Sequence, residues 1–188
     1  MTVKKKRLFT AIDLPVSWLD EIESTSDRLC EQDVRGRFTP RDRLHLTLNF
    51  IGETEEEDSI KRLLAALDRS EAPWISAGSG GLFRRRRGGD LIVWQIENHP
   101  ALSTYQGLEA EALASLGIRR DRRAYKPHLT LARDAKGTLL GSPELVSFFG
   151  KPVAFQAEEL VLYWSHLVNG RLVYSPIARF PFGGETGR

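Results

Sequence analysis

The tetrapeptide His-Leu-Thr-Leu occurs twice in this chain, at residues 45–48 and 128–131. The sequence has four histidines, and two of them, His45 and His128, begin these tetrads. Two imidazoles that face one another can cleave a phosphodiester, since a neutral ring accepts a proton from the attacking oxygen and a protonated ring donates one to the leaving oxygen. An imidazole pKa near 6.5 makes both forms available around neutral pH. The repeat therefore predicts an acid–base site for a phosphate ester.

Alternation along a strand places the polar and apolar residues of each tetrad on opposite faces. His45 and Thr47 then share one face, and His128 and Thr130 share the corresponding face in the second tetrad. The leucines hold each strand against a helical layer. If the two halves are related by a pseudo-twofold axis, both polar pairs meet in one cleft. There the threonine hydroxyls can donate to the phosphate oxygens on which charge builds.

The two tetrad histidines could instead have a structural or a metal-binding role. A histidine followed by apolar strand formers is also an ordinary strand residue, but repetition at corresponding points of two similar halves argues against that interpretation. Paired histidines also bind metals, yet a zinc site needs a third or fourth ligand, and neither tetrad has Asp, Glu or Cys at close spacing. We therefore expect no metal and no cofactor. The glycine-rich segment 78–81 lacks the spacing of a phosphate-binding or dinucleotide-binding loop.

The elements that position the tetrads follow from the apolar patterning, which repeats in two similar halves. In the first half we expect strands at 8–12 and 44–50, a helix that Pro15 opens, and a second helix ended by Pro73. Thr54 and Glu57 resemble a capping box for that second helix.

In the second half we expect strands at 74–83 and 91–97, a helix from Pro100 to Gly117, and a strand at 127–131. A short helix at 142–150 follows, and two long strands, 153–165 and 171–182, meet at an Asn169-Gly170 turn. This order predicts an α+β domain with largely antiparallel sheets and helices on their outer faces. No linker divides the chain, so we expect residues 1–188 to form a single domain with a loose tail at 183–188.

Composition narrows the class of protein. Of 188 residues, 41% are hydrophobic and 28% charged, which indicates a globular chain, and the apolar runs are too short to cross a membrane. One cysteine, Cys30, excludes an internal disulfide. The basic start is followed by an apolar stretch that Asp13 and Pro15 interrupt, so we expect no secretory signal and a cytoplasmic location.

Most of the 27 basic residues are arginines, whose planar guanidinium suits phosphate, although a GC-rich genome produces the same bias. Arginine clusters precede both tetrads, at 35–43 and 119–123. A further run of arginines, at 84–87, lies in an expected turn. It either binds the phosphates of a ligand or is a solvated turn.

In these features the sequence resembles the 2H phosphoesterases, specifically the RNA 2′,3′-cyclic phosphodiesterases, also called 2′–5′ RNA ligases. The likeness covers nearly the whole chain and rests on residues 7–12, 44–52, 126–133 and 160–174. It implies a bilobal α+β fold in which two pseudo-symmetric βαββ-like lobes, with mainly antiparallel sheets, surround a central cleft. It also implies metal-independent hydrolysis of a terminal 2′,3′-cyclic phosphate to a 2′-phosphate. The reverse reaction would form a 2′–5′ linkage on suitable RNA ends.

The resemblance also implies roles for individual residues. His45 would be the proton donor to the leaving 3′ oxygen and His128 the proton acceptor from water, although the symmetry of the tetrads allows the exchanged assignment. Thr47 and Thr130 would bind the phosphate. Arg133, just after the second motif, would contact phosphate or stack on a base.

Two aromatic residues are further candidates for substrate binding, each with a structural alternative. Phe9 could stack on a base or be a core strand aromatic, and Tyr125 could line the cleft or serve packing. His99 and His166 lie outside the tetrads, and we expect both to be structural, with His99 as a helix cap.

We expect RNA with 2′,3′-cyclic phosphate ends, or related nucleotides, as the partner, with no membrane and no obligate protein partner. Two alternatives stay open. The chain could be an RNA-binding module that recognises a phosphate end without cleaving it. It could also be a 2H phosphodiesterase for a small cyclic nucleotide or an oligoadenylate.

Overall fold

The computed structural model describes residues 5–85, 89–119, 121 and 123–183. The strands, in chain order, are β1 Lys6–Ile12, β2 Arg35–Phe38, β3 Leu46–Thr54, β4 Trp74–Ile75, β5 Ala77–Phe83, β6 Asp90–Ile96, β7 His128–Lys136, β8 Phe155–Gln156, β9 Glu159–Val168 and β10 Arg171–Pro181. The α-helices are α1 Val16–Glu31, α2 Glu57–Ala66 and α3 Pro100–Ser115, and short 3₁₀ turns form at η1 Arg41–Arg43, η2 Thr138–Gly141 and η3 Pro143–Phe148. None of the described helices combines the length and apolarity that a membrane crossing requires.

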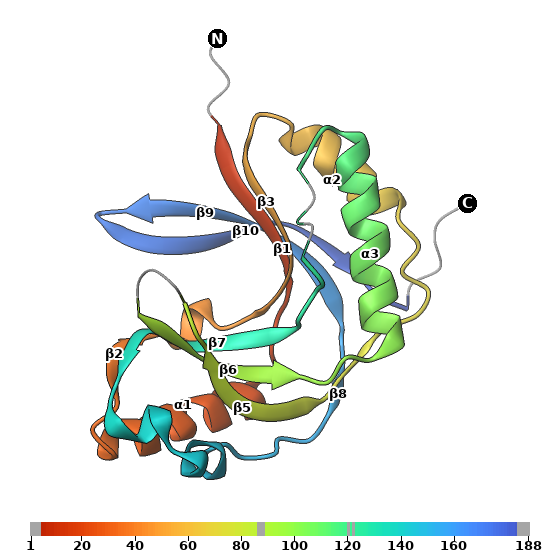
Figure 1. Cartoon of the computed structure of the whole chain (residues 1–188). Helices are drawn as coiled ribbons and strands as arrows, with labels where there is room; N and C mark the ends of the chain where they lie inside the picture. The colour runs from red at the N-terminus through yellow and green to blue at the C-terminus, as the bar shows by residue number, and fades with distance from the viewer. Residues whose placement is uncertain (1–4, 86–88, 120, 122, 184–188) are drawn as a thin grey trace.

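Two four-stranded antiparallel sheets form the body of the protein, with strand orders β10-β9-β1-β3 and β2-β7-β6-β5 (Figure 1). The tetrad strands β3 and β7 hold matching places. β3 pairs with β1, which pairs on its other side with β9, while β7 pairs with β6, which pairs on its other side with β5. This correspondence confirms the expected bilobal, pseudo-symmetric α+β architecture.

The helices cover the outer faces of the sheets, but α1 and α3 are exchanged between the halves of the sequence. Helices α2 and α3 lie beside the sheet that contains β3, whereas α1, from the first half, lies against the sheet that contains β7 (Figure 1). Trp18 of α1 is fully buried, packs edge-on against Phe155 at 5.1 Å between ring centroids, and donates from Nε1 to the Val153 carbonyl at 2.8 Å. Each lobe therefore receives one helix from the other half of the chain, α3 beside the first sheet and α1 against the second.

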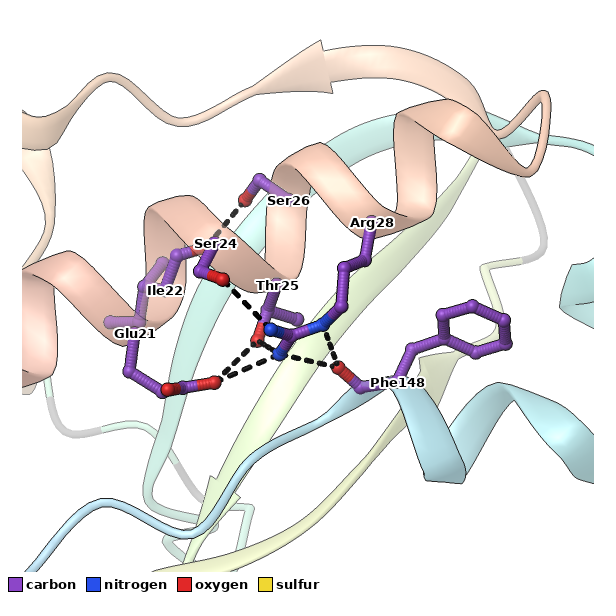
Figure 2. Close-up of polar contacts among 7 residues, drawn as sticks. All are labelled: Glu21, Ile22, Ser24, Thr25, Ser26, Arg28 and Phe148. Carbon is purple, nitrogen blue, oxygen red and sulfur yellow. Dashed lines mark hydrogen bonds and ion pairs between the residues drawn. The ribbon is translucent and has the colours of Figure 1, made fainter.

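A clamp around Arg28 fastens α1 to η3 (Figure 2). The Arg28 guanidinium donates from Nε and Nη2 to the Phe148 carbonyl at 3.2 and 2.9 Å, and from Nη2 to Glu21 Oε1 at 2.8 Å. The next ring along, Phe149, covers Gly80 of β5 so closely that a Cβ at Gly80 would lie 2.1 Å from it. The clamp thus holds η3 over the outer face of the second sheet.

Several expected details differ in the structure. Thr54 and Glu57 do not form a capping box: α2 begins after Glu56, Thr54 Oγ1 accepts from the Glu56 N–H at 3.0 Å, and the Glu57 carboxylate is paired with Lys61 at 2.6 Å. The segment 142–150 forms only 3₁₀ turns. The arginine-rich connector contains a short strand, β2, that the sequence did not predict. Its residues, Arg-Gly-Arg-Phe, do not show the alternation of apolar and polar side chains that indicates a strand.

The turn predictions are confirmed. Asn169 and Gly170 both have positive φ, 50° and 77°, which a two-residue hairpin turn of this type requires. Gly117 follows α3 with φ 78°, and the His99 side chain accepts from the Ala101 N–H at the start of that helix. The expected loose tail lies, apart from Gly183, outside the described residues.

Candidate active site

Both tetrads have the facing that alternation predicts. The leucines at 46, 48, 129 and 131 are at most 4% exposed and belong to the core, while the histidines and threonines of both tetrads are partly exposed on the opposite faces. His45 lies just before β3 and His128 begins β7. Burial of the leucines therefore fixes which way the polar pairs point.

Each tetrad strand is tied to the segment that leads into the other tetrad. The Tyr125 hydroxyl, ahead of the second tetrad, donates to the Thr47 carbonyl at 2.9 Å. Thr39, ahead of the first tetrad, donates from its hydroxyl to the Thr130 carbonyl and from its backbone N–H to the Leu131 carbonyl, both at 2.7 Å. Strands β3 and β7 are also in contact. This reciprocal anchoring brings the two tetrads together.

A cavity of about 1140 Å³ is lined by Thr47 from the first tetrad and by His128 from the second. Ligand pockets are usually about 300–1,000 Å³, so a nucleotide fits this one. Its wall also contains aromatic, amide and cationic side chains, namely Phe50, Phe83, Arg84, Gln106, Arg119, Tyr125 and Lys126. His45 is connected to the cavity through its 3.0 Å contact between Nε2 and Thr47 Oγ1. Thr130, Arg133 and Phe9 do not line it.

The two imidazoles are held by the same device. His45 Nδ1 lies 2.9 Å from the Arg43 carbonyl, and His128 Nδ1 lies 2.7 Å from the Lys126 carbonyl, in both cases two residues earlier in the chain. A carbonyl oxygen can only accept, so each Nδ1 must carry the hydrogen. Nε2 is therefore the nitrogen of each ring that gains or loses a proton.

Burial makes both rings poor bases in the free protein. It lowers the pKa of His45 to about 4, with a further decrease from the positive charge of Arg133, against increases from the Arg43 carbonyl and the Asp13 carboxylate. Burial also lowers the pKa of His128, and Arg133 again contributes. One guanidinium thus acts on both imidazoles, as it would on a single phosphate held between them.

Phe9 is 4% exposed and packs behind His45, with 4.9 Å between ring centroids. It also stacks on Tyr163 at 5.3 Å and meets Tyr174 edge-on at 5.0 Å. A ring so covered has no free face for a base, so the structure favours the core-aromatic alternative for Phe9. On the other side of the site, Phe83 lies 4.8 Å from His128 and supports that ring in the same way.

Phe50 is a site residue that the alternation missed. Counting along the strand puts Phe50 with the buried leucines, yet it is 72% exposed and lines the cavity. The cause is a β-bulge: Ala11 pairs with Thr47 but Thr10 pairs with Asn49, so one extra residue shifts the facing. Asn49 then points to α3, where Gln106 Nε2 donates to Asn49 Oδ1 at 2.9 Å. Polar Asn49 and apolar Phe50 both fit the alternation, so the sequence carries no signal of the bulge.

The arginine clusters noted in the sequence contribute to the cavity to different extents. Arg84 and Arg119 line the cavity, and Arg84 is also paired with Asp90 at 3.0 Å. Arg123 lines it too and is paired with Asp121 at 2.6 Å. Positions 86, 87, 120 and 122 lie outside the described residues. Within the described part of the chain, no three His, Cys, Asp or Glu side chains gather as a metal site would require.

Comparison with known proteins places these features in context. A family model described as the 2′-5′ RNA ligase superfamily matches residues 15–169. The RNA 2′,3′-cyclic phosphodiesterase of Escherichia coli K12 is 31% identical over 93% of this chain and 96% of its own length. The Thermus thermophilus protein of the same name is 32% identical over 97% of this chain and 93% of its own. The crystal structure of E. coli LigT with 3′-AMP matches with a TM-score of 0.76 and 26% identity, covering 95% of this chain and 99% of that one.

Proposed function

Because the chain belongs to the 2′-5′ RNA ligase superfamily, we propose that it is an RNA 2′,3′-cyclic phosphodiesterase that works through His45 and His128. The sequence resemblance to this family is confirmed, and relatives with that name match most of the chain at about 30% identity. The observation that carries the proposal is the single cavity to which Thr47 and His128, from two distant tetrads, both contribute. We further propose that the chain works as a single domain, because its buried side chains form one core across both sheets.

The reaction needs two proton transfers at one phosphorus atom. His128 Nε2 accepts a proton from water, whose oxygen bonds to phosphorus, while His45 Nε2 donates a proton to the departing O3′. The bond from phosphorus to O3′ breaks, leaving a 3′-hydroxyl and a 2′-phosphate. Each transfer typically contributes about 10²–10⁴-fold to the rate. The Thr47 and Thr130 hydroxyls and the Arg133 guanidinium supply donors and positive charge for the non-bridging oxygens.

The low pKa of His45 requires help from the substrate. At about 4 in the free protein, the ring is mostly neutral at pH 7 and cannot act as an acid. A phosphodiester anion bound between the two rings favours the imidazolium, because opposite charges at short distance stabilise one another. Binding of the anionic substrate thus raises the pKa of His45, so that the ring carries the proton that the reaction uses.

Phe50 and Arg119 give the nucleotide a place in the cavity. The exposed ring of Phe50 offers a face on which a base can stack, and stacking is typically worth about 1–3 kcal/mol per base. Arg119 and the other cationic side chains that line the cavity suit the phosphates of an RNA strand. An RNA end with a 2′,3′-cyclic phosphate is therefore the substrate that we propose.

The proposal is tested by incubating an RNA oligonucleotide bearing a terminal 2′,3′-cyclic phosphate with the protein in EDTA and measuring its mass. Hydrolysis adds one water, whereas a binding module leaves the mass unchanged. Parallel reactions with a cyclic mononucleotide and a 2′–5′ linked oligoadenylate distinguish the small-molecule alternative. Unchanged RNA mass with tight binding would contradict the proposed activity.

A further inference from the structure

Asp13 directly follows β1 and His45 directly precedes β3, at the adjoining ends of two paired strands. Strands β1 and β3 are antiparallel, with Ala11 paired to Thr47 and Ile12 paired to Leu46. Asp13 and His45 are the next residues along the two chains, just beyond the ends of the strands, and continuation of this register sets them opposite one another. Directly opposed residues of an antiparallel pair lie on the same face with Cβ atoms about 4.5–5.5 Å apart. Asp13 therefore flanks the imidazole on the cleft face.

Two neighbouring strands hold the Asp13 carboxylate in place. The Tyr163 hydroxyl of β9 donates to Oδ1 at 2.6 Å, and Arg179 Nη1 of β10 donates to Oδ2 at 3.2 Å. Arg179 is also paired with Glu159, so Asp13 does not neutralise this guanidinium alone. The Tyr163 ring itself lies 6.1 Å from His45 between centroids. The Tyr163 side chain thus both holds the Asp13 carboxylate and lies close to the His45 ring.

The groups that face His45 from the surrounding elements can be divided by their charge. Asp13, just after β1, is negative and Arg133 of β7 is positive, while Tyr163 of β9 and Tyr174 of β10 present aromatic rings. The Asp13 charge raises the pKa of His45, whereas burial and Arg133 lower it. His128 faces Arg133 and Phe83, and among the described residues no carboxylate raises its pKa.

We propose that Asp13 is a positioning residue that stabilises the protonated form of His45 and so selects His45, and not His128, as the proton donor. The inference rests on the proposed function, in which one ring donates and the other accepts. It resolves an assignment that the identical tetrads leave open, because among the described residues a carboxylate acts on His45 and none acts on His128.

The direct test is an NMR titration of the His45 imidazole in the full chain, in wild type and Asp13→Asn, without substrate. Loss of the charge lowers the pH at which His45 titrates. The kcat/KM for cyclic-phosphate RNA at pH 7 falls roughly 3- to 10-fold, as expected when a partly exposed opposite charge near the imidazole is removed. The control Glu158→Gln removes one negative charge from an exposed position beside β9 and changes neither measurement.

Two further variants keep the test decisive. Asp13→Glu retains the charge and restores part of the kcat/KM, and Tyr163→Phe removes the donor to Oδ1 and shifts the His45 titration in the same direction as Asp13→Asn, by less. An unchanged His45 titration in a folded Asp13→Asn protein would overturn the inference. Absence of wild-type turnover would instead contradict the proposed function, since the titration does not need a substrate.

Discussion

The Tyr125 hydroxyl donates to the carbonyl of Thr47, a residue 78 positions away, at 2.9 Å. Its counterpart across the cleft is the bond from the Thr39 hydroxyl to the Thr130 carbonyl at 2.7 Å. Each tetrad is thus anchored by the chain segment that introduces the other. The two halves of the active site cannot move apart without losing both bonds, which makes the distance between the tetrads a property of the fold.

Tyr125→Phe is expected to reduce activity and stability by similar free energies. The variant loses one hydrogen bond, typically worth about 1 kcal/mol, and frees the strand that positions Thr47. We expect kcat for cyclic-phosphate RNA to fall at least 5-fold, on the order of that lost free energy, while the unfolding free energy falls by about 1 kcal/mol. Chemical denaturation and steady-state kinetics measure the two effects. A variant with wild-type kcat would show that the anchor does not position the site.

Phe50→Ala is expected to weaken substrate binding without destabilising the protein, because the ring is 72% exposed. Loss of one stacked base raises KM for cyclic-phosphate RNA by about 10-fold, in the lower part of the usual stacking range of about 1–3 kcal/mol. Phe50→Tyr retains the ring and serves as the matched control. If Phe50→Ala leaves KM unchanged, no base stacks at this position.

Glu109 is expected to make stability depend on pH. Its carboxylate on α3 is fully buried, and within the described structure neither oxygen has a hydrogen-bond partner. Burial raises its pKa from 4.5 to about 7. The folded state therefore holds this proton more tightly than the unfolded state, so the contribution to stability is complete below about pH 4.5 and is lost as the pH rises through about 7.

Glu109→Gln removes this dependence. Above pH 7 the variant is expected to be more stable than wild type by up to about 3 kcal/mol, and the advantage shrinks toward pH 4.5. Urea denaturation of both proteins between pH 4.5 and 8 measures the difference between their free energies of unfolding. The histidines contribute equally to both proteins, so their contribution cancels in this difference. A constant difference across that range would mean that Glu109 does not titrate there.

Arg28→Met is expected to destabilise the protein while leaving its chemistry intact. The variant leaves the Phe148 carbonyl and the Glu21 carboxylate without their donor, a loss of about 1–3 kcal/mol. The clamp joins α1 to η3 (Figure 2), and none of its residues lines the cavity. The melting temperature is expected to fall, while kcat at 25 °C stays at the wild-type value. A large fall in kcat with an unchanged melting temperature would contradict this division.

The tetrads could be predicted from the sequence because their leucines and their polar residues obey one local rule, alternation along a strand. Phe50 could not, since a single bulge reverses its facing and depends on how Asn49 meets α3. Asp13 was visible only as an interruption of an apolar run, because its partner, His45, is set by strand pairing. The exchange of α1 onto the second sheet is likewise a long-range choice that no local pattern around Trp18 records.

The central claim is that His45 and His128 act together on one phosphate. Single-turnover rates on a cyclic-phosphate RNA, for wild type, His45→Ala, His128→Ala and the double variant in EDTA, test it most directly. Since each ring performs one half of a concerted exchange, each single variant is expected to lose at least about 10²-fold, and the double variant little more than either. A His128→Ala or His45→Ala protein that hydrolyses the substrate at the wild-type rate would contradict the account.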